Sequence, residues 1–412
     1  MRKKLLKTVR RYYNRVVNSI AFYPAVIALV FLILSYIVLT LDFSEFGKEL
    51  KSQWDFLSLK DASTARTIAA TIAAGILSLT VFSFSMVMIL LNQAASNMSN
   101  RVLGSLIGNR FQQYVLGFYI GTIVYALFLL STIRDIDSGI YVPALSVYLL
   151  IVLTVVDIFL FIYFIHYITQ SVKFETIIAR IHQETKRELE NNSHLAEESM
   201  ERVPVFTQGQ ELKAEASGYF QGFDRKELLR LCKEQDISVG FVFPVGTYVL
   251  EGVPFLKVSS LKPVTDEQQA QIRLLVDFYR GESISNTPYY GFKQLVEVAL
   301  KALSPGVNDP GTAVLSLHAL VDLLAFRLRN FAYRLIKDED GVVRIVTVED
   351  SFRDIFMQTL LPMWDYGQSD RVFRTEMKKV LDQLHVFHTA PEDHALIEDL
   401  RQKVKQKIQE EA

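Results

Sequence analysis

Four long apolar runs occupy the first 170 residues of this 412-residue chain, at 20–41, 67–91, 114–132 and 140–168. Each is about as long as the roughly 20 helical residues that cross the hydrocarbon core of a bilayer. Asp157 is the only Asp, Glu, Lys or Arg within them, although 22% of the whole chain is charged. The pattern predicts a membrane α-helical fold with four transmembrane helices, followed by a soluble α+β domain.

Lys and Arg near the ends of membrane spans favour the cytoplasmic side. The segment 1–19 carries seven of these cations and no acid, whereas residues 42–66 mix acids with cations. We therefore expect both termini, and everything after residue 170, to lie in the cytoplasm. A signal peptide is the competing interpretation of the N-terminus, but its apolar run is too long and no small-residue cleavage site follows.

The second apolar run carries small polar residues at an unbroken seven-residue spacing, which places them on one stripe of a helix: Thr71, Ser78, Ser85, Asn92 and Ser99. One interpretation is a packing seam, because small and hydroxyl residues let membrane helices approach closely. The other is that the stripe lines an aqueous path in an oligomer. The two interpretations are compatible at different depths.

Asp157 lies deep in the fourth run, where an ionised carboxylate is costly unless it is neutral, paired or wet. The second and fourth spans run in the same direction, so equal depth predicts that Asp157 lies near Ser83 and Ser85. A hydrogen bond from a serine to the carboxyl group and a proton or ion role both fit. In the third run, Gly117 and Gly121 form a GxxxG motif that predicts close helix packing within the chain or between chains.

The remaining chain divides by pattern into a solvated helical stalk at 171–200, a small β-rich α+β subdomain at 201–262 and a mainly helical domain at 263–412. Strands are expected at 218–223, 238–243, 247–251 and 255–258, and a hairpin joins 331–336 to 342–348 across the sequence DEDG. Thr265 and Gln268 have capping-box spacing and predict a helix that ends near Gly281.

The string SPGVNDPGTA interrupts this helical region through Ser304, Pro305, Gly306, Asn308, Asp309 and Pro310. Pro305 and Gly306 should end one helix, and Asp309 followed by Pro310 is typical of an N-cap and first turn. Asn308 and Asp309 could alternatively bind an ion or a polar ligand. His318 and Asp322 share a helix face and are expected to form a hydrogen-bonded pair.

Catalytic and cofactor chemistry has little support in the sequence. No GxSxG, HExxH, P-loop or GxGxxG motif occurs, so we expect neither an enzyme nor a cofactor. The single Cys232 cannot form an internal disulfide, and the Cys and His spacing favours no metal. A formal net charge of -1 gives no argument for nucleic acid as a partner.

Two strings carry a resemblance to a known family: YVLGFYIGTIVYALFLL at 114–130 and GFKQLVEVALKALSPGVNDPGTA at 291–313. Together they resemble the bacterial membrane family called domain of unknown function 2254, over nearly the whole chain. The resemblance implies a bacterial inner-membrane location and a cytoplasmic C-terminal domain, and it brings no established activity.

The function class that uses the polar second span, Asp157 and the C-terminal half together is an oligomeric ion channel or pore with a cytoplasmic regulatory domain. Its expected partners are the lipid bilayer, further copies of the chain and a small ion. The rival class is a membrane-anchored sensor or scaffold that binds a cytoplasmic ligand or protein and conducts nothing.

Overall fold

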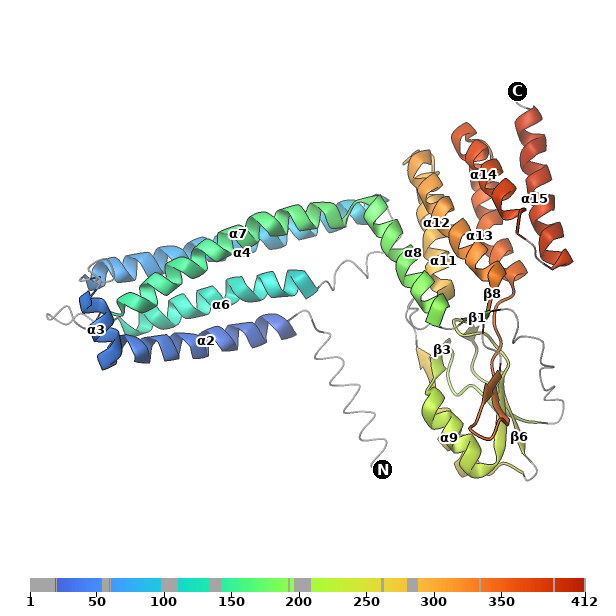
Figure 1. Ribbon diagram of the computed structural model, residues 1–412, viewed down its shortest axis with the longest axis horizontal. Helices are drawn as coiled ribbons and strands as arrows, with labels where there is room; N and C mark the ends of the chain where they lie inside the picture. The colour runs from blue at the N-terminus through green and yellow to red at the C-terminus, as the bar shows by residue number, and fades with distance from the viewer. Residues whose placement is uncertain are drawn as a thin grey trace. The chain divides into compact units, whose positions relative to one another are not determined.

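A computed structural model describes residues 19, 21–53, 59, 61–97, 110–133, 142–191, 193–195, 209–260, 263–279, 288–332, 335–387 and 390–410. The chain forms two compact units (Figure 1). The first, here called the helical unit, comprises Met1–Ser96 and Asn100–Lys173, and the second, the C-terminal unit, comprises Asn97–Ser99 and Phe174–Ala412. Apart from Ser19, the predicted basic segment 1–19 lies outside the described residues.

The helical unit contains a helix at each predicted apolar run: α2 (Phe22–Phe43), α4 (Ala62–Asn97), α6 (Arg110–Thr132) and α7 (Ala144–Ser171). They have 22 to 36 residues, about 33 to 54 Å of helix. A hydrocarbon core is about 30 Å thick, so each is long enough to cross it. A short helix, α3 (Glu45–Gln53), follows α2.

Five described helices are long and apolar enough to cross a membrane, because α12 (Pro310–Arg329) of the C-terminal unit also meets this test. It packs there with α8 (Phe174–Asn191), α11 (Pro288–Ala302), α13 (Phe352–Gly367) and α14 (Arg371–Leu384). Length and composition alone therefore do not decide the number of spans.

Asp42, at the end of α2, joins three elements of the helical unit. Its carboxylate is fully buried, lies 2.8 Å from Lys51 Nζ of α3 and accepts hydrogen bonds from the backbone N–H and the hydroxyl of Ser146 in α7. A carboxylate is favourable at a helix N-terminus, where free N–H groups and the helix dipole meet it. Asp42 therefore fixes the end of α2 to both α3 and α7.

Two of the three sheets described in the C-terminal unit enclose an apolar core. The larger has the order β2 (Gln210–Lys213), β6 (Pro254–Ser260), β4 (Ile237–Phe241), β10 (Val343–Val346) and β9 (Leu335–Lys337), and the smaller has β5 (Tyr248–Val249), β3 (Gly218–Phe223) and β7 (Val276–Tyr279). All pairs are antiparallel except β10 with β4. The sheet therefore takes strands from both sides of the predicted boundary at residue 262.

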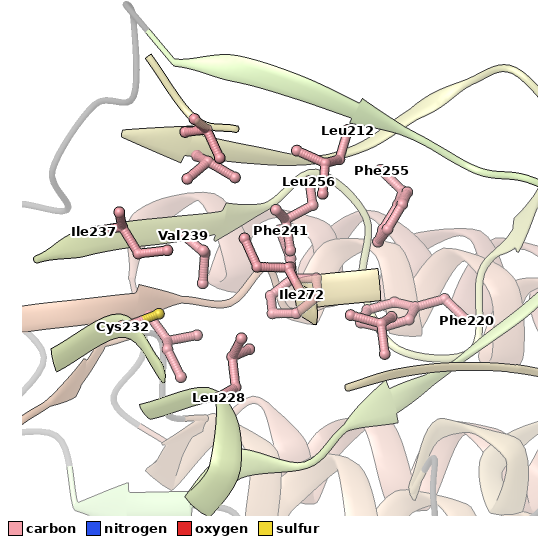
Figure 2. Close-up of a cluster of buried hydrophobic side chains, with 14 of the residues drawn as sticks. Leu212, Phe220, Leu228, Cys232, Ile237, Val239, Phe241, Phe255, Leu256 and Ile272 are labelled. Atoms are coloured by element: carbon pink, nitrogen blue, oxygen red, sulfur yellow. The ribbon is translucent and has the colours of Figure 1, made fainter. Parts of the chain in front are cut away.

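The core of this unit is filled by alternate strand residues and by two helices, α9 (Arg225–Gln235) and α10 (Asp266–Leu274), as Figure 2 shows. Leu228 and Cys232 of α9 are fully buried against Val239. Burial raises the pKa of the Cys232 thiol to about 12. This cysteine is therefore a small apolar core residue with negligible thiolate at neutral pH.

The helix predicted from Thr265 is shorter than expected. Its capping box with Gln268 is present, but α10 ends at Leu274 and the chain continues as β7, which pairs with β3. Val276 is buried in the core and Phe278 packs against the core. A strand buries both of these alternate side chains, and this packing favours the strand over a longer helix. Gly281, the predicted end, lies outside the described residues.

The predicted solvated stalk is also corrected. Its described part, α8, buries Ile177, Ile178, Ile181 and Thr185 and packs on α11 and α12. These positions follow helical spacing, so one face of a highly charged helix is apolar. The helix is part of the C-terminal unit's helical layer, which ends with α15 (Pro391–Glu410). Residues 193–195 form a strand, β1 (Ser193–Leu195), that pairs with β8 (Asn330–Ala332).

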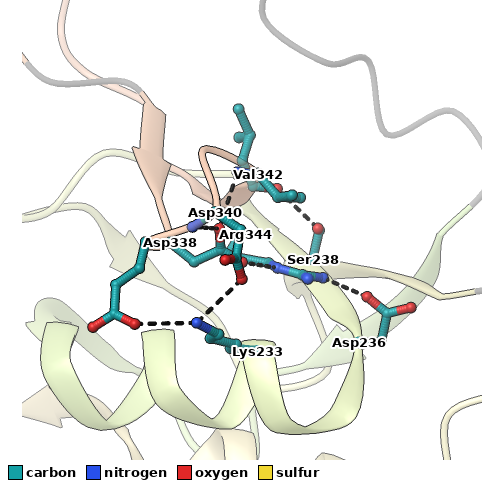
Figure 3. Close-up of polar contacts among 9 residues, drawn as sticks. Lys233, Asp236, Ser238, Asp338, Asp340, Val342 and Arg344 are labelled. Atoms are coloured by element: carbon teal, nitrogen blue, oxygen red, sulfur yellow. Dashed lines mark hydrogen bonds and ion pairs between the residues drawn. The ribbon is translucent and has the colours of Figure 1, made fainter.

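The predicted hairpin across DEDG is confirmed in β9 and β10, but its strands are shorter than predicted, because 331–332 belong to β8. Asp338 accepts hydrogen bonds from the backbone N–H groups of Asp340 and Val342, and Gly341 has φ +79°. Arg344 donates to Asp338 at 2.8 Å and also reaches Asp236 after α9, so the turn is tied to a distant segment (Figure 3).

Candidate functional site within the helical unit

The polar stripe on α4 faces away from the other helices of its unit. Thr71, Ser78, Ser85 and Asn92 are all exposed, and Ser99 lies outside the described residues. The buried side of α4 is instead formed by Ala65, Ala69, Ala73, Ile76 and Ser83. Among the described residues, the stripe is therefore not the side of α4 that packs against the other helices of its unit.

The hydroxyl donors of the stripe are partly satisfied by the helix itself. Ser78 donates to the Ala74 carbonyl at 3.0 Å and Ser85 donates to the Val81 carbonyl at 2.9 Å. This back-bonding lowers the cost of a serine in an apolar environment, and it leaves the hydroxyl oxygens as acceptors on the outer face.

A second polar group lies on the opposite, inward side of α4. Asp157 of α7 and Tyr119 and Thr122 of α6 have no exposed surface, and Ser83 of α4 is 4% exposed. We call these four residues the inner cluster. All lie near the middle of their helices, with about 20 Å of α7 on either side of Asp157.

The members of the inner cluster are neighbours. The Thr122 hydroxyl lies beside the Asp157 carboxyl group, and the Ser83 hydroxyl lies beside the Tyr119 phenol. Tyr119 and Asp157 are close enough for an electrostatic interaction. Even so, the side-chain oxygens of these four residues have no hydrogen-bond partner in good geometry among the described residues. Of the two serines predicted near Asp157, Ser83 faces inward and Ser85 does not.

Apolar layers enclose the inner cluster at both ends. On one side Leu150 of α7 packs with Tyr125 and Leu129 of α6, and on the other Phe164 of α7 packs with Val115 of α6. The antiparallel course of α6 and α7 explains this order. The cluster is thus a polar layer between two apolar layers of the bundle.

The GxxxG residues lie where α6 crosses α2 within one chain. A Cβ at Gly117 would be 2.5 Å from Ile27 Cδ1 and 3.2 Å from the Pro24 Cα, and one at Gly121 would be 2.7 Å from the Phe31 ring. Only glycine allows this approach, and it brings α6 close enough to hold Thr122 inside the bundle.

In the C-terminal unit, the motif at 304–310 forms the connection from α11 to α12. The predicted N-cap is confirmed: Asp309 accepts from the Thr312 N–H at 3.1 Å and from the Thr312 hydroxyl at 2.6 Å. Asn308 has φ +48°, and its N–H donates to the Ser304 carbonyl. Both Asp309 oxygens are used locally, so the geometry favours the capping role over ligand binding.

The expected pair between His318 and Asp322 is wrong. His318 Nε2 lies 2.9 Å from Glu376 of α14, while Asp322 contacts His182 at 2.8 Å and Lys186 at 3.0 Å on α8. Burial acts to raise the pKa of Asp322, but the hydrogen bonds with Lys186 and His182 outweigh it and hold that pKa below its usual range. Within the described residues, no group of three His, Cys, Asp or Glu could hold a metal ion.

A groove of about 290 Å³ runs along α8 and α12, and its polar lining includes His182, His318 and Asp322. It is lined by Glu175, Ile178, Ala179, His182, Leu315, His318, Ala319 and Asp322. The sequence did not predict this groove, because its two sides are far apart in the chain and α8 was expected to be solvated.

The family model described as predicted membrane protein (DUF2254) matches residues 17–383. The chain belongs to this family. An uncharacterized protein of Mycobacterium bovis is 28% identical over 267 residues, covering 62% of this chain and 51% of that protein. An uncharacterized protein of Mycobacterium tuberculosis matches with the same identity and coverage. The chain thus spans about half the length of these curated relatives, and no solved structure matches it.

Proposed function

We propose that this protein is an oligomeric ion channel or pore of the bacterial inner membrane, in which α4 lines the path. In this proposal α2, α4, α6 and α7 cross the bilayer, both termini are cytoplasmic, and the C-terminal unit regulates conduction from the cytoplasm. The role is neither enzymatic nor nucleic-acid binding. The partners are the bilayer, further copies of the chain and a small ion.

One observation carries the proposal: Thr71, Ser78, Ser85 and Asn92 are all exposed on the side of α4 that faces away from its own unit. Membrane helices meet partners through small and polar faces, and pore-lining hydroxyl and amide groups can replace part of an ion's hydration shell. A symmetric ring of chains that meet at α4 would turn the stripe toward a common axis. Such closed rings are the usual form of homo-oligomers.

The count of four spans is supported by the surroundings of α12. That helix begins at an N-cap, carries Asp322 in an ion pair with Lys186, and contacts Glu376 through His318. It buries Leu317, Leu320 and Leu324 among neighbouring helices. An apolar helix with charged partners on several sides is a core helix of a water-soluble unit. The excess of Lys and Arg before α2 then supports a cytoplasmic N-terminus.

The test is ion flux through purified protein in liposomes. Ser85→Leu adds volume and removes a hydroxyl on the stripe, and it should strongly reduce flux while the oligomer keeps its size. Leu77→Phe is the matched control, since Leu77 is also exposed but lies about 80° around the helix. Flux should survive in this control. No flux from the parent protein over a range of pH, salt and membrane tension would refute the channel.

A sensor or scaffold is the second candidate, and the groove between α8 and α12 favours it. The groove combines apolar walls with two histidines and two acids, as a small polar ligand would require. A parent protein that conducts nothing, together with saturable ligand binding lost in Ala179→Trp, would favour this function instead.

A further inference from the structure

We propose that the inner cluster binds one small monovalent cation, with Asp157 as its charged ligand and Thr122, Tyr119 and Ser83 as neutral oxygen ligands. The site lies inside a single helical unit, on the side of α4 opposite to the stripe. It therefore goes beyond the proposed conduction path and does not require it.

The charge of Asp157 supplies the first argument. Two aspartates are fully buried among the described residues of the helical unit, and their partners differ. Asp42 has the Lys51 ammonium group at 2.8 Å and hydrogen bonds from Ser146, whereas Asp157 forms no ion pair with any described residue. A carboxylate deep in a membrane protein needs a compensating charge, a proton or water. A bound cation would supply that charge.

The second argument is the kind of ligand that the cluster offers. One carboxylate and three hydroxyl groups, from α4, α6 and α7, are near one another, nearly fully buried and without good internal hydrogen bonds. Such groups are hard oxygen donors, and the cluster offers no nitrogen or sulfur that would select a transition metal. A single negative charge balances a monovalent ion, whereas calcium sites use six to eight oxygens and commonly several carboxylates.

The surroundings supply the third argument. The apolar layers that include Leu150 and Phe164 separate the cluster from both ends of the bundle. In such a medium the attraction between Asp157 and a cation is much stronger than in water. The hydroxyl groups can turn their oxygens toward the ion and so replace water molecules of its hydration shell.

The test is equilibrium dialysis of the full-length protein in detergent against radioactive sodium, in a buffer whose only other cation is N-methylglucamine. The parent protein should bind one sodium ion per chain, and its melting temperature should rise with sodium concentration. Asp157→Asn should abolish binding while the variant remains folded, because the neutral amide keeps the shape and removes the charge. Thr122→Val should weaken binding about tenfold, because valine lacks the hydroxyl ligand but has nearly the same volume as threonine.

Thr169→Val is the matched control, because it makes the same change as Thr122→Val on the exposed side of α7, the helix that supplies Asp157. It should leave sodium binding unchanged. The proposal is overturned if the parent binds no sodium, lithium or potassium, or if Asp157→Asn binds as well as the parent. It is also overturned if the parent's melting temperature does not respond to these ions, which would leave a permanently neutral carboxyl group. None of these readouts depends on flux, so they are independent of the channel test.

Discussion

Replacing Gly121 with alanine should disrupt the contact between α6 and α2. The added Cβ would lie 2.7 Å from Phe31 Cγ and 2.9 Å from both Cδ atoms. Carbon atoms in favourable contact are about 3.5 to 4.0 Å apart, so the overlap is roughly 0.6 to 1.3 Å. The Phe31 ring is only 6% exposed and is overlapped close to its own Cβ, so it cannot simply turn away. We expect a loss of about 2 to 3 kcal/mol, the upper part of the range for overpacking.

Two other glycines provide a graded comparison. At Gly117 the shortest contact is with Ile27 Cδ1, the flexible end of a side chain, so Gly117→Ala should cost less than Gly121→Ala. At Gly75 on α4 an added Cβ would meet nothing within 4 Å, so Gly75→Ala should be neutral or slightly stabilising. The order of the three variants follows from space alone, because the chemical change is identical.

The assay is equilibrium unfolding of the full-length protein in mixed detergent micelles, followed by circular dichroism. The double variant Phe31→Ala with Gly121→Ala tests the mechanism, because removing the ring should make the added methyl group much less harmful. The two changes should then couple by about 1 kcal/mol or more. Equal stability of Gly121→Ala and Gly75→Ala, or strict additivity in the double variant, would refute the close crossing.

Two further predictions concern the C-terminal unit, where Trp364 can report unfolding in urea in a Trp54→Phe background. Asp309→Ala should destabilise this unit by about 1 to 2 kcal/mol through loss of the cap and of the Thr312 hydrogen bond, while Asp309→Asn should cost little; equal losses in both variants would contradict the capping role. Arg344 holds the pKa of Asp338 below its usual range, so this pair stabilises the unit above about pH 4 and the contribution is lost as pH falls through the lowered folded-state pKa. Stability measured from pH 6 down to pH 3 should converge for the parent and Asp338→Asn, and a constant difference would rule out this linkage.

Local patterns were sufficient wherever neighbouring residues in the chain decide the structure. The long apolar helices follow from the length of apolar runs, and the caps at Thr265 and Asp309 follow from side chains that bond to backbone groups three residues away. The DEDG hairpin is of the same kind. The partners of His318 and Asp322 were not predictable in this way, since they lie on helices that are distant in sequence.

The candidate site was likewise predictable where it depends on one helix and not where it depends on packing between helices. Heptad spacing placed Thr71, Ser78, Ser85 and Asn92 on one face of a helix, and depth placed Asp157 near the second span, but neither indicated which face of α4 is turned inward. That choice depends on the small side chains of Ala65, Ala69 and Ala73, which pack against α6 and α7 and so turn Ser83 inward, to the side of Tyr119. No sequence pattern distinguishes Tyr119 and Thr122 from other residues of an apolar span, because their neighbour Asp157 lies on a different helix.

The sequence by itself determined that this protein has long apolar helices, the approximate position of each, and which polar residues share a stripe, because these properties depend on helix periodicity and on hydrophobicity along one segment. The tertiary structure alone decided that the stripe faces outward, that the charged helix α8 is partly buried, and that three hydroxyl side chains gather with Asp157 in the inner cluster. Those outcomes depend on how side chains from several helices fill a shared space, and that packing is not encoded in any one segment.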